Sequence, residues 1–371
     1  MGTIAVGVVT VSAALYLSYQ TLETVSQRLD FGFLVRAAGV EISEGYTLDK
    51  VEGTLTWLPF VSSHTNWQAL LTGGFNTLKI AIFAIVFSTL LGVAVALGRI
   101  STNWLLRQFC FGYVEVIRNT PLLIQLVFWY FAVLLKLPLL ADAADLYGFA
   151  IASRQGLVFP SFHLDPGLPG LGKSGAFFTL AVAGLMIALG QKKKMAGLTV
   201  AWWGALLGAT VAVLLLRLEF PKLEAFDTAG GSKLSPEFSA LFLALSINTA
   251  AFIAEAVRGA IFSLPRGQWE AAGALGLSRR SVQRDIVIPQ VFRIVLPSLG
   301  NQYISLTKST SFGIAIGYPD LFNIYGTIAN QTGRTVEGIL VVILVYVLLS
   351  WLISSSVNLL NRRLSARGGS R

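Results

Sequence analysis

Long apolar runs separated by short polar stretches dominate this sequence. A bilayer core about 30 Å thick requires around 20 mostly apolar residues when the chain crosses it as a helix. Eight segments reach or approach that length: Ile4–Leu22, Thr77–Gly98, Tyr113–Leu137, Ala176–Gly190, Ala196–Leu216, Phe238–Ile261, Ile294–Ile316 and Gly338–Leu360. The pattern therefore predicts an all-α, polytopic helical membrane protein with about eight transmembrane helices.

The composition favours a membrane protein and argues against several other classes. Of the 371 residues, 54% are hydrophobic and 13% are charged, whereas soluble domains carry about 25% charged residues. The net charge of +9 is typical of a membrane protein with basic cytoplasmic loops, and the basic runs lack the interleaved aromatic residues of a single-strand binder. We expect membrane lipid, and no nucleic acid, as its surroundings. One cysteine, Cys110, and two histidines predict neither a disulfide framework nor a metal site.

Lysine and arginine residues gather in alternate loops, and short cytoplasmic loops are the ones enriched in both. Eight spans place all of these groups on one side, so both termini are expected in the cytoplasm. The apolar start of the chain lacks a basic n-region, which predicts a retained first span. The basic positions are Arg99 and Arg107, Lys192, Lys193 and Lys194, Arg266, Arg279, Arg280 and Arg284, and Arg362, Arg363, Arg367 and Arg371.

Residues 262–290 are polar and basic although they lie between two membrane-length apolar segments. Their alanines favour a short helix over Gln268–Leu275, which would present Glu270 and Gly273 on one side. Glu270 in the first turn suits the helix dipole. The small residues let another surface approach the backbone closely, so the segment predicts a contact with another protein. An interfacial helix held by anionic lipid is the alternative.

The residues after this short helix predict a stop and then a second helix. Gly276 suits the left-handed position that ends a helix, and Ser278 suits the N-cap of the next one. Pro289 is expected to end that second helix, because proline lacks the backbone N–H. The pattern predicts two short helices joined by a sharp bend.

This loop resembles the cytoplasmic coupling loop of ABC-importer permeases, with Glu270-Ala271-Ala272, Gly276 six residues after the glutamate, and then Ile286-x-Ile288-Pro289. The resemblance implies docking on a cytoplasmic ABC ATPase dimer. We expect no phosphate loop in this chain, so the partner ATPase binds Mg-ATP and this chain has no cofactor of its own. The residues implied in docking are Glu270, Ala271, Ala272, Gly273, Gly276, Ile286 and Pro289.

Three further stretches, Tyr113–Gln125, Asn248–Gly259 and Leu306–Ser311, resemble the polar amino-acid uptake branch of these permeases. Branch members carry histidine, glutamine, glutamate, arginine and opines. The resemblance implies a five-helix type I importer permease core in a bacterial inner membrane. It also implies a periplasmic amino-acid-binding protein as a partner. A second permease subunit is implied as well, with a heterodimer favoured and a homodimer open.

The sequence departs from the minimal branch pattern by an extra N-terminal helix and an inserted helical hairpin. We expect residues 1–70 to form the N-terminal transmembrane helix and a periplasmic loop. Residues 71–138 form the first part of the permease core, and 139–235 form periplasmic loops with the inserted transmembrane hairpin. Residues 236–371 form the second part of the core, with the coupling loop at 262–290.

Ionisable residues inside apolar segments mark candidate sites, because burying them is costly unless they are paired or face water. Glu115 and Arg118, and likewise Glu255 and Arg258, are three residues apart on one helix face, where they can pair. These four residues are candidates for a gate or lining of a translocation path. Structural ion pairs that fix helix orientation are the alternative.

Neutral polar residues and one lysine also interrupt the apolar segments. They can line an amino-acid path, although polar side chains inside helix bundles also serve as interhelical hydrogen-bond partners. Pro121 is expected to kink or open the third segment. The candidates for the substrate lining are Gln125, Asn248, Thr249, Gln302 and Lys308.

No Ser/His/Asp, metal or paired-carboxylate constellation is recognisable, so we expect no catalytic residue and no enzyme activity. The resemblance predicts a permease subunit of an ATP-driven, binding-protein-dependent amino-acid importer, in which closure of the ATPase drives alternating access. The alternative is a self-contained secondary transporter or channel for small polar solutes. Such a protein requires ion-coupling sites near the midplane and leaves the loop at 262–290 unexplained.

Overall fold

The computed structural model describes residues 16, 29–51, 53–164, 216–224 and 227–366. It divides into two compact units, one of Met1–Trp129 with Ala240–Arg371 and one of Tyr130–Ser239. Three predicted membrane segments, at 4–22, 176–190 and 196–216, lie outside the described residues except for Tyr16 and Leu216. The total number of transmembrane helices therefore stays a prediction, as do the extra N-terminal helix and the inserted hairpin.

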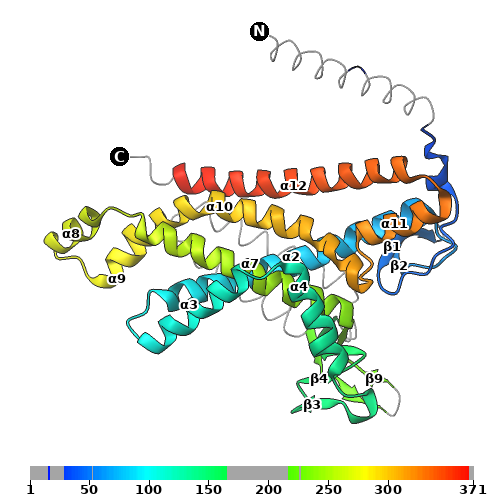
Figure 1. Cartoon of the computed structure of the whole chain (residues 1–371), viewed down its shortest axis with the longest axis horizontal. Coiled ribbons are helices and arrows are strands. Elements are labelled where there is room, and N and C mark those ends of the chain that lie inside the picture. Colours follow the sequence, from blue (N-terminus) through cyan, green and yellow to red (C-terminus); the bar gives the residue numbers. More distant parts are fainter. Residues whose placement is uncertain (1–15, 17–28, 52, 165–215, 225–226, 367–371) are drawn as a thin grey trace, which may run out of the picture. The chain divides into compact units, whose positions relative to one another are not determined.

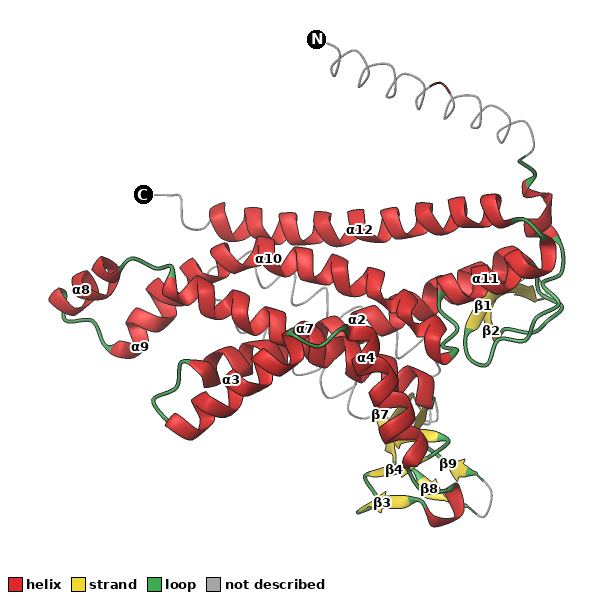
Figure 2. Ribbon diagram, in the orientation of Figure 1, coloured by secondary structure: helices red, strands yellow, loops and turns green. Residues whose placement is uncertain are grey.

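The first unit is mainly helical, as Figures 1 and 2 show. Its first part contains the 3-10 helix η1 (Phe31–Val35), the hairpin β1 (Tyr46–Val51) and β2 (Thr54–Pro59), and helices α2 (Asn66–Arg99), α3 (Trp104–Arg118) and α4 (Leu122–Val127). Its second part contains most of α7 (Pro236–Phe262), then α8 (Arg266–Ala274), α9 (Arg279–Ser281), the π-helix η5 (Val282–Val287), α10 (Ile288–Ser309), the 3-10 helix η6 (Thr310–Ile316), α11 (Leu321–Thr332) and α12 (Thr335–Ala366).

Three helices of the described chain are long and apolar enough to cross a membrane: Asn66–Arg99, Pro236–Phe262 and Thr335–Leu359. A fourth candidate is the pair Trp104–Arg118 and Leu122–Lys136, which bends by 105° at the break. Pro121 lies in that break, so the expected opening of the third segment is confirmed. Proline disfavours helical geometry in the residue before it, which explains why α3 ends at Arg118.

Helices α2 and α7 approach each other closely because α2 carries glycine and alanine on the buried side. A Cβ atom added at Gly92 would lie 2.7 Å from Cβ of Ile253 and 2.9 Å from the carbonyl oxygen of Ala250. Small residues permit such short helix–helix distances in membrane proteins. Helix α10 joins the same packing through a hydrogen bond of 2.9 Å between the hydroxyls of Thr89 and Tyr303.

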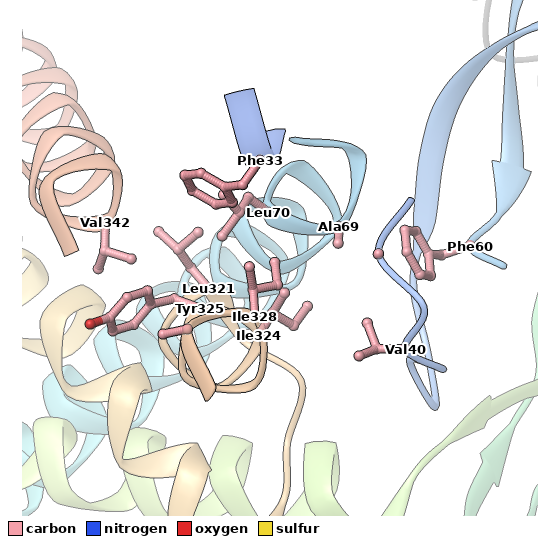
Figure 3. Packing of buried hydrophobic residues seen from close by; sticks show 12 residues of the cluster. Phe33, Val40, Phe60, Ala69, Leu70, Leu321, Ile324, Tyr325, Ile328 and Val342 are labelled. Carbon is pink, nitrogen blue, oxygen red and sulfur yellow. The ribbon is translucent and has the colours of Figure 1, made fainter. Parts of the chain in front are cut away.

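A second cluster of buried side chains ties the N-terminal segment to α2, α11 and α12. Figure 3 shows Phe33 and Leu70 with Leu321 and Tyr325 in this cluster. The amide of Asn66 adds a buried hydrogen bond of 2.9 Å to the carbonyl oxygen of Phe33. The segment before α2 is therefore packed on the helices of the first unit.

The second unit contains strands, so the expectation of an all-α protein is corrected to a mostly helical one. Its four-stranded antiparallel sheet has the order β10 (Ser232–Leu234), β5 (Gly156–Phe159), β4 (Ala150–Ser153) and β3 (Ala144–Leu146). Ile151 and Val158 are buried in it. Gly156, with φ of +125°, allows the tight turn between β4 and β5. Such short strands leave only a weak alternation of apolar and polar residues in the sequence. This explains why these residues were expected to form periplasmic loops and not strands.

The described part of the second unit consists mainly of short helices and short strands. After the π-helix η2 (Phe128–Val133) come the 3-10 helices η3 (Leu134–Lys136) and η4 (Leu140–Asp142), and then β3 (Ala144–Leu146), β4 (Ala150–Ser153), β5 (Gly156–Phe159), β6 (Ser161–Leu164), β7 (Leu216–Glu219), β8 (Lys222–Leu223), β9 (Thr228–Ala229) and β10 (Ser232–Leu234). Strands β6 and β7 pair antiparallel, and so do β8 and β9.

Candidate functional site

Helix α8 ends in the left-handed stop that its sequence predicts. Gly276 has a φ of +66°. The N–H of Leu277 donates to the carbonyl of Ala272 at 3.1 Å, and the N–H of Gly276 donates to the carbonyl of Gly273 at 3.0 Å. These two bonds form the Schellman motif that satisfies the free carbonyls at a helix end. The side chain of Ser278 then accepts from the N–H of Ser281 at 3.2 Å, as an N-cap does.

The loop has a small core of its own, and most described side chains of α8 lie outside it. Ala272 is 2% exposed and packs with Leu264, Val282 and Val287, against which Ile286 is partly buried. The exposed positions on and just after α8 include Gly267, Gln268, Glu270, Ala271, Gly273, Ala274, Leu275, Gly276, Leu277 and Ser278. The predicted docking residues thus divide into two residues of this small core, Ala272 and Ile286, and an exposed set of Glu270, Ala271, Gly273, Gly276 and Pro289.

The expectation that Pro289 ends a short second helix is wrong. Residues Arg279–Ser281, the π-helix η5 and α10 follow one another without a break, and Pro289 lies in the first turn of α10. Within a continuous helix, proline removes one backbone donor and its ring crowds the preceding turn. The wider π-helical turns just before it change the hydrogen-bond register, so the chain continues as a helix through the proline.

Three charged residues join α2 to α7. The carboxylate of Glu255 accepts from Arg99 of α2, and from Arg258 at 2.5 Å and 3.3 Å. The Arg99 side chain is 9% exposed, and that of Glu255 is 27% exposed. The predicted Glu255–Arg258 pair is confirmed, whereas the part of Arg99 was not foreseen. The guanidinium groups of Arg99 and Arg258 also lie 5.4 Å from the ring centres of Phe111 and Phe262, respectively.

Glu115 and Arg118 do not repeat this arrangement. Glu115 is exposed on α3, and no ion pair joins it to Arg118 in the described chain. The Arg118 guanidinium lies instead over the ring of Phe252 on α7, 5.4 Å from the ring centre. Arg118 therefore contacts α7 through a cation–π interaction.

A cavity of about 580 Å³ lies where the break after α3 meets α7, α10 and η6. Its polar lining combines one cation with neutral hydroxyl and amide groups, and it contains no carboxylate. A space of this size and polarity suits a small solute. The lining residues are Arg118, Asn119, Thr120, Pro121, Leu122, Leu245, Asn248, Thr249, Phe252, Gln302, Ser305, Leu306, Ser309 and Phe312.

The structure separates the substrate-lining candidates into two groups. Asn248, Thr249 and Gln302 line this cavity. Gln125 does not; it is 6% exposed, and its amide donates to the carbonyls of Ile117 and Thr120 at 3.0 and 2.9 Å. Those carbonyls lose helical partners at the break, so Gln125 stabilises the break itself. Lys308 lines a different cavity of about 430 Å³ with residues of α12.

Several members of the site were not expected from the sequence. Phe252, Ser305 and Ser309 line the cavity, and Arg99 completes the charged cluster. Ser305 and Ser309 are one helical turn apart and continue the line begun by Gln302, a spacing that places them on one face. That spacing was a usable signal, whereas the position of Phe252 under Arg118 depends on how α3 and α7 pack.

Contrary to the expectation of no phosphate loop, the chain contains one match to the phosphate-loop spacing. Residues Gly167–Ser174 do match the spacing Gly-x-x-x-x-Gly-Lys-Ser of a phosphate loop, and they lie outside the described residues. A phosphate loop follows a strand of a βαβ unit and begins a helix. The strand that precedes this match, β6, pairs antiparallel with β7. The match therefore lacks the parallel-sheet context of a nucleotide site.

The chain is similar to a known family and to known proteins over most of its length. Residues 88–367 match the family described as binding-protein-dependent transport system inner membrane component. The general L-amino acid transport system permease protein AapQ of Rhizobium johnstonii is 40% identical over 346 residues, covering 90% of this chain and 83% of that protein.

Two further relatives are similar over nearly the whole chain. The putative amino-acid ABC transporter permease protein YhdX of Escherichia coli is 36% identical over 94% of this chain and 90% of its own length. The glutamate/glutamine/aspartate/asparagine transport system permease protein BztB of Rhodobacter capsulatus is 32% identical over 94% of this chain and 89% of its own length. With its membrane-length helices and this family match, the chain is a multi-pass membrane protein that belongs to the inner membrane components of binding-protein-dependent transport systems.

Proposed function

We propose that this chain is the permease subunit of an ATP-driven amino-acid importer and that amino acids pass through the cavity beside Arg118. The observation that carries the proposal is a direct mechanical connection. Helix α8 is joined at one end to α7, which contributes Asn248 to the cavity, and through α9 and η5 to α10, which contributes Gln302. A force on α8 therefore acts on two helices of the cavity wall.

The named relatives support amino acids as the solute class, because all three carry amino-acid transport in their names. A separate ATPase dimer would bind Mg-ATP and dock on the outward residues of α8. A periplasmic binding protein would deliver the amino acid, and a second permease subunit, in a heterodimer, would complete the path. The basic loops support the orientation in which α8 and both termini are cytoplasmic.

The chemistry of the cavity supports a solute that carries a carboxylate. Arg118 is the one cation in its lining, and a guanidinium binds a carboxylate by charge-assisted hydrogen bonds. The amides of Asn248 and Gln302 both donate and accept hydrogen bonds, which suits an ammonium group or a polar side chain. A secondary transporter is less well supported, because it would require carboxylates or backbone sites for its coupling ion, and the described lining has no carboxylate.

Reversing the charge of Glu270 tests the coupling role of α8. We expect Glu270→Lys to lower ATP-driven uptake by about tenfold or more, because a lost charge-assisted contact costs about 1.5–3 kcal/mol. Co-purification of the ATPase should fall in parallel. Gln283→Lys is the matched control, since Gln283 is also exposed on the same loop but lies in η5. Unchanged uptake and unchanged ATPase retention in Glu270→Lys would contradict the docking role.

Replacing Gln302 tests the cavity as the path. Gln302→Leu keeps the size of the side chain but removes its hydrogen-bonding groups, so we expect a several-fold fall in the initial uptake rate with ATPase retention unchanged. Asn301→Leu is the neighbouring control, because Asn301 is exposed and does not line the cavity. Uptake would be measured with labelled amino acids in proteoliposomes at saturating binding protein. Equal uptake by both variants would rule out a path through this cavity.

A further inference from the structure

The β1–β2 hairpin turns its apolar face outward, which is the reverse of the arrangement in a hairpin that faces water. Its register pairs Tyr46 with Pro59, Leu48 with Trp57 and Lys50 with Leu55, and alternate side chains of a strand share a face. Tyr46, Leu55 and Trp57 on this face are 59%, 73% and 53% exposed. A hairpin on a water-facing surface normally turns its apolar face inward. The outward face of this hairpin is therefore apolar.

The opposite face of the hairpin carries Thr47, Asp49, Thr54 and Thr56 besides Leu58, and its polar groups bond to neighbouring parts of the first unit. The hydroxyl of Thr47, which is fully buried, donates to the carbonyl of Gln68 on α2 at 3.4 Å. Asp49 lies 3.3 Å from Nε2 of the buried His64. The side-chain amide of Gln68 in turn donates to the carbonyl of Leu48 at 3.1 Å. These contacts fix which face points outward.

The apolar face of the hairpin is continuous with the exposed apolar side of α2. The ring of Trp57 packs edge-on against Phe75, with the ring centres 4.7 Å apart. Within the predicted segment Thr77–Gly98, the stretch free of charged residues runs from Ile80 to Gly98, between Lys79 and Arg99. At 1.5 Å per residue, Phe75 lies about 7 Å outside this stretch. That distance corresponds to the headgroup layer, which extends about 5–8 Å beyond each side of the hydrocarbon core.

We propose that the β1–β2 hairpin is a membrane anchor that lays Tyr46, Leu48, Leu55, Trp57 and Pro59 into the interfacial layer of the bilayer, beside α2. Tryptophan and tyrosine favour this layer because their rings are amphipathic. Lys50 lies on the same face, where its apolar stem can follow the surface while the ammonium group reaches a lipid phosphate. The anchor holds the segment before α2 at the level where that helix leaves the membrane. It depends only on the membrane location of the chain, not on the solute carried.

Adjacent positions on the two faces of β2 allow a direct test. Leu55→Cys and Thr54→Cys would each be made with Cys110→Ala, because Cys110 is the one native cysteine. Both Leu55 and Thr54 are exposed, but on opposite faces. Each variant would be labelled with an environment-sensitive fluorophore and studied in the assembled transporter in phosphatidylcholine and phosphatidylglycerol vesicles. We expect the label at Leu55 to emit at a shorter wavelength and to be quenched by lipid carrying a headgroup-proximal nitroxide, and the label at Thr54 to be quenched by a water-soluble reagent.

Two outcomes would overturn the proposal. Equal quenching of both labels by the water-soluble reagent would place the hairpin away from the bilayer. Protection of the Leu55 label from both quenchers in the assembled transporter, with quenching by the water-soluble reagent once the chain is separated from its partners, would assign the apolar face to a protein partner. Because the readout needs no transport, either result leaves the proposed function to be tested separately.

Discussion

Uptake is expected to fall by about 10- to 100-fold when Arg118 is replaced by glutamine. The loss of a hydrogen bond to a charged group costs about 1.5–3 kcal/mol, and each 1.4 kcal/mol corresponds to a factor of ten. Arg118 is the single cation in the described lining of the cavity, so no neighbouring charge can replace it. The contact of its guanidinium with Phe252 would also be weakened. The measurement is the initial rate of labelled amino-acid uptake into proteoliposomes that contain the full complex.

Two further variants serve as comparisons for Arg118→Gln. Arg118→Lys keeps the charge but loses the planar, bidentate donor geometry, so we expect an intermediate rate. Arg107→Gln removes an exposed arginine from the same helix, outside the cavity, and should leave uptake nearly unchanged. The affinity of the binding protein for its amino acid and the retention of the ATPase should be the same in all three. Normal uptake by Arg118→Gln would show that the cation is not used by the solute.

The second large effect is expected at the charged cluster between α2 and α7. Glu255→Gln removes the one carboxylate that Arg99 and Arg258 share, and leaves Arg99 with a 9% exposed side chain. Breaking a fully buried ion pair from one side costs about 3–5 kcal/mol. The partial exposure of Glu255 reduces this, so we expect a loss of about 1–3 kcal/mol. The thermal midpoint of the purified complex should fall, and uptake should fall with it if the cluster holds the two helices together at a gate.

The cluster also offers an internal check. Arg99→Gln combined with Glu255→Gln should be less harmful than the sum of the single variants, because residues in one network do not act additively. Glu115→Gln is the surface control, since Glu115 is exposed on α3. If Glu255→Gln unfolds at the same temperature as Glu115→Gln, the cluster does not stabilise the contact between α2 and α7. If stability falls but uptake does not, the cluster is structural and not a gate.

The two Glu–Arg pairs show why residue spacing alone could not predict which residues form an ion pair. Both pairs are three residues apart on a helix and therefore share a face. Glu255 lies on a helix that packs closely on α2, and this packing adds Arg99 from a position 156 residues earlier. Glu115 faces outward, and its neighbour Arg118 reaches Phe252 instead. The same local signal thus led to one ion pair and one cation–π contact.

The roles of the polar residues within the apolar segments likewise depend on contacts with other segments. Gln125 and Gln302 are both glutamines within predicted spans, and both were candidates for the substrate lining. Gln125 hydrogen-bonds to backbone carbonyls because the helix breaks between Arg118 and Leu122, whereas Gln302 lies on an unbroken part of α10 and lines the cavity. The side chain of a polar residue in a membrane helix satisfies whichever groups lie nearest, and those come from other segments.

Local sequence was sufficient for features that depend on neighbouring residues alone. The long apolar runs determined the helices α2, α7 and α12, and the stop at Gly276 followed from its freedom to adopt positive φ. The order of small and polar residues in 262–290 was enough to indicate the family. Contacts between distant segments decided the rest: which residues share the cavity, how Arg99 reaches Glu255, and which face of the β1–β2 hairpin points outward. Periodicity assigns a side chain to a face of its own helix or strand, but only the packing of segments far apart in the chain determines what that face meets.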